Sequence, residues 1–289
     1  MTQIKLLALD LDGTLLNSHG KISEQNLQAI RAAEERGVLV TIATGRRFRD
    51  ARPVGLEAEL NAPLITHNGA LTKYAETLET VNVSILNEQE ARAVLRVGRG
   101  FCADAMVSCD PRGKGLLLYD SVSEWNVPLQ KYLAWSRRLH GDEAEEAVRH
   151  VESLEDNLSS IEIVHISFSG TCASMVELQT MLEKELEGAV KVLATVYTSQ
   201  NFTLLDVLHA EASKGYGLKR FAEFRDIKPE EIMVMGDNFN DVEMLEFAGL
   251  PVVMGNASPE LLENPKYETT LSNDESGVAS AIEKFILRS

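Results

Sequence analysis

An apolar run that stops abruptly at an acidic residue is the feature that most limits how this chain can fold. Residues 4–9 are largely apolar and are followed directly by Asp10. Such a run is typical of a strand buried in a parallel sheet. Ser23 can cap a helix that ends at Gly37, and residues 38–43 form a second apolar run. A strand, a helix and another strand make the repeating unit of parallel sheets, so we predict an α/β fold.

The same pattern returns near the C-terminus. Predicted strands at 232–235 and 250–254 flank a predicted helix at 242–248 that Gly249 closes. A final amphipathic helix is predicted at 278–287. Because both ends of the chain carry the pattern, we predict that they share one doubly wound, Rossmann-like parallel sheet.

The middle of the chain has a different pattern, in which strands alternate between apolar and polar residues. Residues 206–211 are interpreted as strand and loop rather than as a substrate contact. Alternating strands favour an open sheet with one covered face. We therefore predict a smaller α/β domain at 84–196, inserted into a core made of 1–83 and 197–289. Within this insertion, strands are predicted at 103–107, 116–119, 161–168 and 190–196, and helices at 87–94, 125–139 and 176–186.

Asp10, Leu11, Asp12, Gly13 and Thr14 follow the first predicted strand directly. Ligand sites in open α/β sheets lie at the carboxyl ends of the strands. Asp10 could attack phosphorus and form an acyl-phosphate. Asp12 could protonate a leaving oxygen and later activate water. A solvent-exposed turn is an equal alternative for this segment alone, since Asp and Gly are common turn residues.

Two further clusters lie where a phosphate could be bound. Thr44, Gly45 and Arg46 follow the second predicted strand, where a hydroxyl, backbone N–H groups and a guanidinium can hold an anion. Ser213 and Lys214 begin a predicted helix that runs to residue 224, and the lysine can neutralise a phosphate oxygen. Taken singly, an ordinary helix cap and a solvated lysine are the better interpretations.

A fourth cluster, residues 236–241 with the sequence GDNFND, follows the predicted strand at 232–235. Its carboxylate and amide oxygens suit Mg²⁺, which proteins hold with few carboxylates and the substrate's oxygens. An Asn- and Asp-rich turn is the alternative. Together the four clusters supply a nucleophile, an acid/base, a cation, an anion cradle and metal ligands, and this division of roles favours an enzyme.

The charge of the chain limits its partners. The formal net charge is −16 and the isoelectric point is about 4.9. Such a surface repels nucleic acid and anionic membranes, and it also repels a phosphorylated substrate unless the site reverses the field locally. Three cysteines without CxxC spacing, and an N-terminus without a signal-peptide pattern, predict a cytoplasmic protein with free thiols.

The four clusters, in this order, resemble the motifs of the haloacid dehalogenase superfamily: DxDGT, TGR, SKG and GDNxND. The chain is most similar to the Cof-like sugar-phosphate phosphatases, which carry a large α/β cap between the second and third motifs. The tripeptide that begins at Asn68 matches a recurrent element of that group. Ser213 stands where many relatives have Asn, and we expect no loss of activity from this difference.

The resemblance implies a Mg²⁺-dependent phosphatase that forms an aspartyl-phosphate and acts on small phosphorylated metabolites such as sugar phosphates. It implies that Asp10 is the nucleophile, Asp12 the acid/base and Lys214 a catalytic cation. The implied metal ligands are Asp10, the backbone carbonyl of Asp12, and Asp237, with Asp241 supporting them. The implied phosphate contacts are Leu11, Thr44, Gly45, Lys214 and Asn240, and the expected substrate contacts are Arg46 and Asn68.

Two other functions share these motifs. A phosphotransferase or sugar phosphomutase would use the same aspartyl-phosphate but exclude water from the second step. A noncatalytic sensor of phosphometabolites would need neither a nucleophile nor an acid/base, so the intact clusters argue against it. In either enzyme, we expect the residues that set substrate specificity to lie between Asn87 and Val190.

Overall fold

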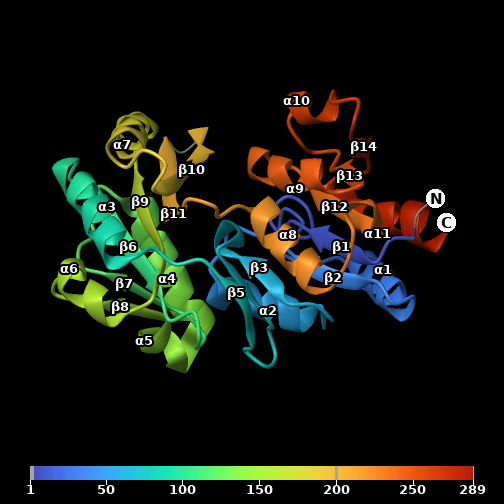
Figure 1. The fold of residues 1–289 in the computed structure, drawn as a ribbon, viewed down its shortest axis with the longest axis horizontal. Helices are drawn as coiled ribbons and strands as arrows, with labels where there is room; N and C mark the ends of the chain where they lie inside the picture. The colour runs from blue at the N-terminus through green and yellow to red at the C-terminus, as the bar shows by residue number, and fades with distance from the viewer. Residues whose placement is uncertain (1–2, 199–200, 289) are drawn as a thin grey trace. The chain divides into compact units, whose positions relative to one another are not determined.

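The computed structural model describes residues 3–198 and 201–288, and the contacts divide the chain into two compact units. The first unit contains residues 1–46, 51–82 and 213–289, and the second contains 47–50 and 83–212. Each unit is built around a large sheet of its own (Figure 1). No helix in the described part of the chain is long and apolar enough to cross a membrane.

The first unit contains a five-stranded sheet in the order β14-β13-β12-β1-β2, in which every neighbouring pair is parallel. Its strands are β1 (Leu6–Leu9), β2 (Leu39–Ile42), β12 (Ile232–Gly236), β13 (Leu250–Val253) and β14 (Glu268–Thr269). The prediction that the two ends of the chain share one parallel sheet is confirmed, since β1 lies between β2 and β12. Three short strands, β3 (Leu64–Thr66), β4 (Leu71–Lys73) and β5 (Thr80–Val83), form a separate sheet that was not predicted.

The helices of the first unit follow local signals in the sequence. Helix α1 begins after Ser23, whose side chain accepts a hydrogen bond from the backbone of Asn26. On one face of the sheet, Leu6 and Ala8 pack with Leu218 of α8 and Met244 of α9. The helices are α1 (Glu24–Glu35), α2 (Phe48–Glu57, from residue 51 onward in this unit), α8 (Lys214–Phe224), α9 (Val242–Phe247), α10 (Pro259–Leu262) and α11 (Gly277–Ile282), and a π-helical turn at Glu283–Leu287 continues α11.

The second unit contains a mixed six-stranded sheet in the order β10-β11-β9-β6-β7-β8, which confirms the prediction of an inserted α/β layer. Its pairs are antiparallel except for β7 with β8. The strands are β6 (Asp104–Cys109), β7 (Leu116–Tyr119), β8 (Val148–His150), β9 (Ile163–Gly170), β10 (Val190–Tyr197) and β11 (Phe202–His209). The helices are α3 (Glu88–Gly100), α4 (Val127–His140), α5 (Ala144–Ala147), α6 (Leu154–Asn157) and α7 (Cys172–Glu185).

Apolar side chains cover both faces of this sheet around β6. Ala105 and Val107 belong to the core under α3 and α7, whereas Met106 packs with Leu129 and Leu133 of α4. The expectation of a single covered face is therefore wrong at this end of the sheet. The reason is that α4 lies on the second face, and a strand pattern alone does not show which helix returns to cover it.

Two segments group with the second unit although the sequence boundaries place them in the core. Strand β11 pairs with β10 and β9, so the second unit continues to residue 212 rather than 196. Residues 47–50 join it because the buried Arg47 binds Asp50, the Tyr132 hydroxyl and the Ser136 hydroxyl. Burial would raise the pKa of Asp50, but the ion pair with Arg47 holds that pKa well below its usual range.

Candidate active site

Asp10 lies at the carboxyl end of β1, next to the neighbouring strand β12. The four residues of β1 are fully buried, and the backbone N–H of Asp10 donates to the carbonyl of Met235 at 2.9 Å. The Asp10 side chain is 6% exposed. The strand therefore fixes a carboxylate in a nearly dry position, and burial raises the pKa of Asp10 well above its usual value.

Lys214 supplies the positive charge beside Asp10. It is the first residue of α8, whose preceding Ser213 accepts a hydrogen bond from the backbone of Tyr216. The Lys214 ammonium donates to Asp10 Oδ1 at 2.5 Å and to Asp241 Oδ1 at 2.7 Å. Burial alone would lower the pKa of Lys214, but the two carboxylates outweigh it and raise the pKa. The lysine is therefore charged and held between two acids rather than solvated.

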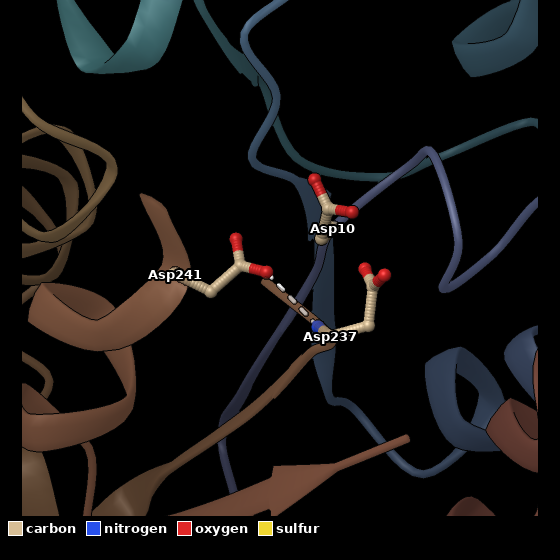
Figure 2. A group of neighbouring side chains, drawn as sticks. All are labelled: Asp10, Asp237 and Asp241. Atoms are coloured by element: carbon tan, nitrogen blue, oxygen red, sulfur yellow. Dashed lines mark hydrogen bonds between the residues drawn. The ribbon is translucent and has the colours of Figure 1, made fainter. Parts of the chain in front are cut away.

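Asp10, Asp237 and Asp241 form a cluster of three carboxylates (Figure 2). One oxygen from each lies within 4.8 Å of the others. Asp241 is fully buried, and its Oδ2 accepts hydrogen bonds from the backbones of Asp237 and Asn238, both at 3.0 Å. Burial and the charge of Asp241 raise the pKa of Asp237 to about 6. Three oxygen donors in one partly buried cluster fit a hard divalent cation, whose charge would offset their mutual repulsion.

The turn after Asp10 holds Asp237 in place. Gly13 has φ +89, and a Cβ there would lie 2.3 Å from Asp237 Oδ2, so only glycine fits. The Thr14 hydroxyl donates to Asp237 Oδ1 at 3.1 Å, and the Asn256 side-chain amide donates to the Gly13 carbonyl at 2.9 Å. No role for Thr14 or Asn256 was predicted from the sequence. The place of Thr14 inside the DxDGT motif was a usable signal, whereas Asn256 carries none.

Arg46 and Asp12 form a bidentate ion pair at the edge of the site. Arg46 Nε donates to Asp12 Oδ2 at 2.8 Å, and Arg46 Nη2 donates to Asp12 Oδ1 at 2.6 Å. Thr44 follows shortly after the end of β2 and is buried. Its hydroxyl accepts a hydrogen bond from the backbone N–H of Arg46 at 3.2 Å. The structure thus brings Arg46 to the predicted acid/base residue.

A turn of 3-10 helix at His67–Gly69 supports both Thr44 and Lys214. Its three residues have φ of 52, 49 and 89, in the left-handed region. The backbone N–H groups of His67 and Asn68 donate to the carbonyls of Arg46 and Thr44, at 2.9 and 3.0 Å. A Cβ on Gly69 would lie 1.8 Å from the Ser213 carbonyl, so the turn touches the start of α8.

Most of the predicted site residues are thus joined by contacts within the first unit. Asp10, Lys214, Asp237 and Asp241 form one cluster, and Asp12 pairs with Arg46. Gly45 lies against the side chain of Asn68, since a Cβ there would lie 3.1 Å away. Leu11 is buried directly after Asp10, and Asn240 is exposed in the 3-10 turn Phe239–Asp241.

Comparison with known proteins identifies the family of the chain. Residues 7–282 match the family model of haloacid dehalogenase-like hydrolases. The YxeH protein of Bacillus subtilis is 30% identical over 98% of both chains. The 5-amino-6-(5-phospho-D-ribitylamino)uracil phosphatase YwtE of the same organism is 29% identical over 98% of both chains. The crystal structure of TM0651 from Thermotoga maritima has a TM-score of 0.78 and 26% identity, and the match covers 98% of this chain and 97% of that one. The chain belongs to the haloacid dehalogenase-like hydrolases, and it is a phosphatase of that family.

Proposed function

We propose that this chain is a Mg²⁺-dependent phosphatase that hydrolyses small phosphorylated metabolites through an aspartyl-phosphate on Asp10. The observation that carries the proposal is the buried contact of Asp10 with Lys214, beside the carboxylates of Asp237 and Asp241. A carboxylate held this way can attack phosphorus, because the fixed Lys214 cation favours its charged form and offsets its repulsion from a phosphate.

The reaction takes two displacements at phosphorus. An oxygen of Asp10 bonds to phosphorus while the bond from phosphorus to the ester oxygen breaks, and Asp12 gives a proton to the departing oxygen. Water then bonds to phosphorus, the bond to Asp10 breaks, and Asp12 takes the proton from water. The products are an alcohol and inorganic phosphate. Asp10 ends as the carboxylate, and Asp12 ends as the protonated acid, in which forms they began.

The acidic cluster is the proposed site of Mg²⁺. Asp10, Asp237 and the backbone carbonyl of Asp12 would hold the ion. Asp241 would orient these ligands, because its oxygens already accept hydrogen bonds from Lys214 and two backbone N–H groups. Bound there, Mg²⁺ would supply positive charge against the repulsion between the Asp10 carboxylate and a phosphate dianion. Lys214, the first residue of α8, contributes a further positive charge.

The phosphate group itself is proposed to rest against the loop ends around Asp10. The backbone of Leu11, the Thr44 hydroxyl, the backbone of Gly45 and the exposed amide of Asn240 are the proposed contacts, and Asn68 is a proposed substrate contact. The field of a chain with net charge −16 disfavours anions in general, so the binding energy for phosphate must come from this local set.

We further propose that the leaving group is a sugar or a sugar-like alcohol. The relative YwtE is named for a substrate whose phosphate is carried by a ribityl chain, which is an open sugar alcohol. The alkoxide of a sugar alcohol is a strong base and therefore a poor leaving group. Its departure depends on a proton donor, and Asp12 is the proposed donor.

Replacing Asp10 with asparagine tests the proposal. Asp10→Asn keeps the size of the side chain but removes the nucleophilic carboxylate, so we expect phosphate release from a panel of phosphorylated sugars and cofactor precursors to fall by at least about 1,000-fold. Acid-quenched wild-type protein should carry one phosphoryl group on the peptide that contains Asp10. The exposed Glu260→Gln removes the same charge and should keep wild-type activity. Substantial turnover by a folded Asp10→Asn protein would contradict the nucleophile assignment.

A further inference from the structure

Asp12 is the least enclosed of the proposed reacting groups. Its side chain is 59% exposed, whereas that of Asp10 is 6% exposed. A carboxylate at such a position would ordinarily sample several rotamers. Here both of its oxygens receive an N–H from one guanidinium, at 2.8 and 2.6 Å, and this fork sets the plane of the carboxylate.

Arg46 is the less exposed member of this ion pair, and hydrogen bonds hold its backbone. Its backbone N–H donates to the hydroxyl of the buried Thr44, and its carbonyl accepts from the backbone of His67 at 2.9 Å. Its side chain is 27% exposed. The guanidinium therefore extends from a fixed backbone and is the more buried of the two charged groups.

We propose that Arg46 is a positioning residue that orients the Asp12 carboxyl for proton transfer to the leaving oxygen. This inference rests on the proposed function and departs from the expectation that Arg46 contacts substrate. A carboxylate offers about four lone-pair sites, and the guanidinium occupies two of them, so each oxygen keeps a site that can carry the proton. An exposed pair contributes little to the free energy of folding, so we expect the chain to stay folded when Arg46 is replaced.

The inference predicts a dependence on the leaving group. A p-nitrophenolate is stable as an anion and leaves without a proton, whereas an alkoxide must be protonated as it leaves. General acid catalysis contributes roughly 100- to 10,000-fold where it is needed. A residue that only positions the acid therefore matters for an alkyl phosphate and much less for p-nitrophenyl phosphate.

The test compares kcat/KM of the full chain, with Mg²⁺, on p-nitrophenyl phosphate and glycerol 1-phosphate. Arg46→Met should lose at least about tenfold more activity on glycerol phosphate than on the nitrophenyl ester, and Asp12→Asn should show the same bias. Arg46→Lys keeps the charge but cannot span both oxygens, so it should share the bias in weaker form. Arg31→Met removes another arginine of an ion pair in the same unit, with the exposed Glu59, and should leave both activities unchanged.

The double variant Asp12→Asn with Arg46→Met separates positioning from other roles. With the acid removed, the loss of Arg46 should cost less than about threefold on glycerol phosphate. Equal losses on both esters in Arg46→Met and Arg46→Lys, or a full additional loss in the double variant, would overturn the inference, because Arg46 would then act on the shared phosphate or on the fold. Failure of the wild-type chain to hydrolyse either ester would instead contradict the proposed function.

Discussion

Thr14 shows how one hydroxyl can tune the candidate metal site. The Thr14 side chain is fully buried, and its hydroxyl donates a hydrogen bond to one oxygen of Asp237. This bond orients the carboxylate and therefore also fixes the direction of its other oxygen. Thr14→Val keeps the branched shape and removes the donor, so we expect the Mg²⁺ concentration for half-maximal activity to rise by roughly 10- to 100-fold. Thr14→Ser keeps the donor and should stay near the wild-type value. An unchanged Mg²⁺ dependence in Thr14→Val would show that the bond does not orient Asp237.

Individual site residues were predictable to the extent that they sit at strand ends. Asp10 and Asp237 follow apolar runs, and an apolar run that stops at an acid marks the carboxyl edge of a parallel sheet. The Arg46 contact with Asp12 was not predictable in the same way, because 34 residues separate the two and only the folded loops bring them together. The positive φ of His67 was equally hard to predict, since a positive φ is uncommon for residues other than glycine.

At the scale of elements, the turn His67–Gly69 and helix α8 act as one support for Lys214. A Cβ on Gly69 would meet the backbone carbonyl of Ser213, which cannot move without shifting the start of α8. We expect Gly69→Ala to destabilise the chain by a few kcal/mol, about 1 kcal/mol of it from the positive φ, and to lower kcat/KM as well. Gly37 has φ +82 and open space around its Cβ position, so Gly37→Ala carries the conformational cost alone. Denaturant midpoints and kcat/KM of the two variants measure how much more Gly69→Ala costs than Gly37→Ala. Equal losses in both variants would show that the turn does not support the start of α8.

Elements with local signals were predicted well, and elements that depend on distant partners were not. Ser23, Asn87 and Ser213 each cap a helix that was predicted to begin there, because the start of a helix depends on a few neighbouring residues. Strand β11 belongs to the second unit because it pairs with β9 and β10. Residues 47–50 belong to it because the side chain of Arg47 binds Tyr132. Such long-range contacts leave little trace in a local pattern.

At the scale of the whole molecule, net charge and metal binding should combine in the stability of the fold. The chain carries −16, so any salt weakens its self-repulsion, but Mg²⁺ should add a specific gain through the acidic cluster. A ligand that binds only the folded state adds about 2.7 kcal/mol at a hundred times its Kd. We therefore expect MgCl₂ to raise Tm by several degrees more than NaCl at the same ionic strength, and chelation to abolish activity until Mg²⁺ is restored.

Two variants that remove the same charge separate the specific gain from screening. Asp237→Asn removes a proposed ligand and should respond to MgCl₂ only as it does to NaCl. Glu260→Gln, exposed on α10, should keep the full Mg²⁺-specific rise in Tm. If the two variants respond alike, the stabilisation is general screening of an acidic surface, and the three carboxylates do not hold the ion. Since the two variants have the same net charge and each differs from the wild type at one position, the comparison assigns any remaining difference to the cluster at the carboxyl ends of β1 and β12.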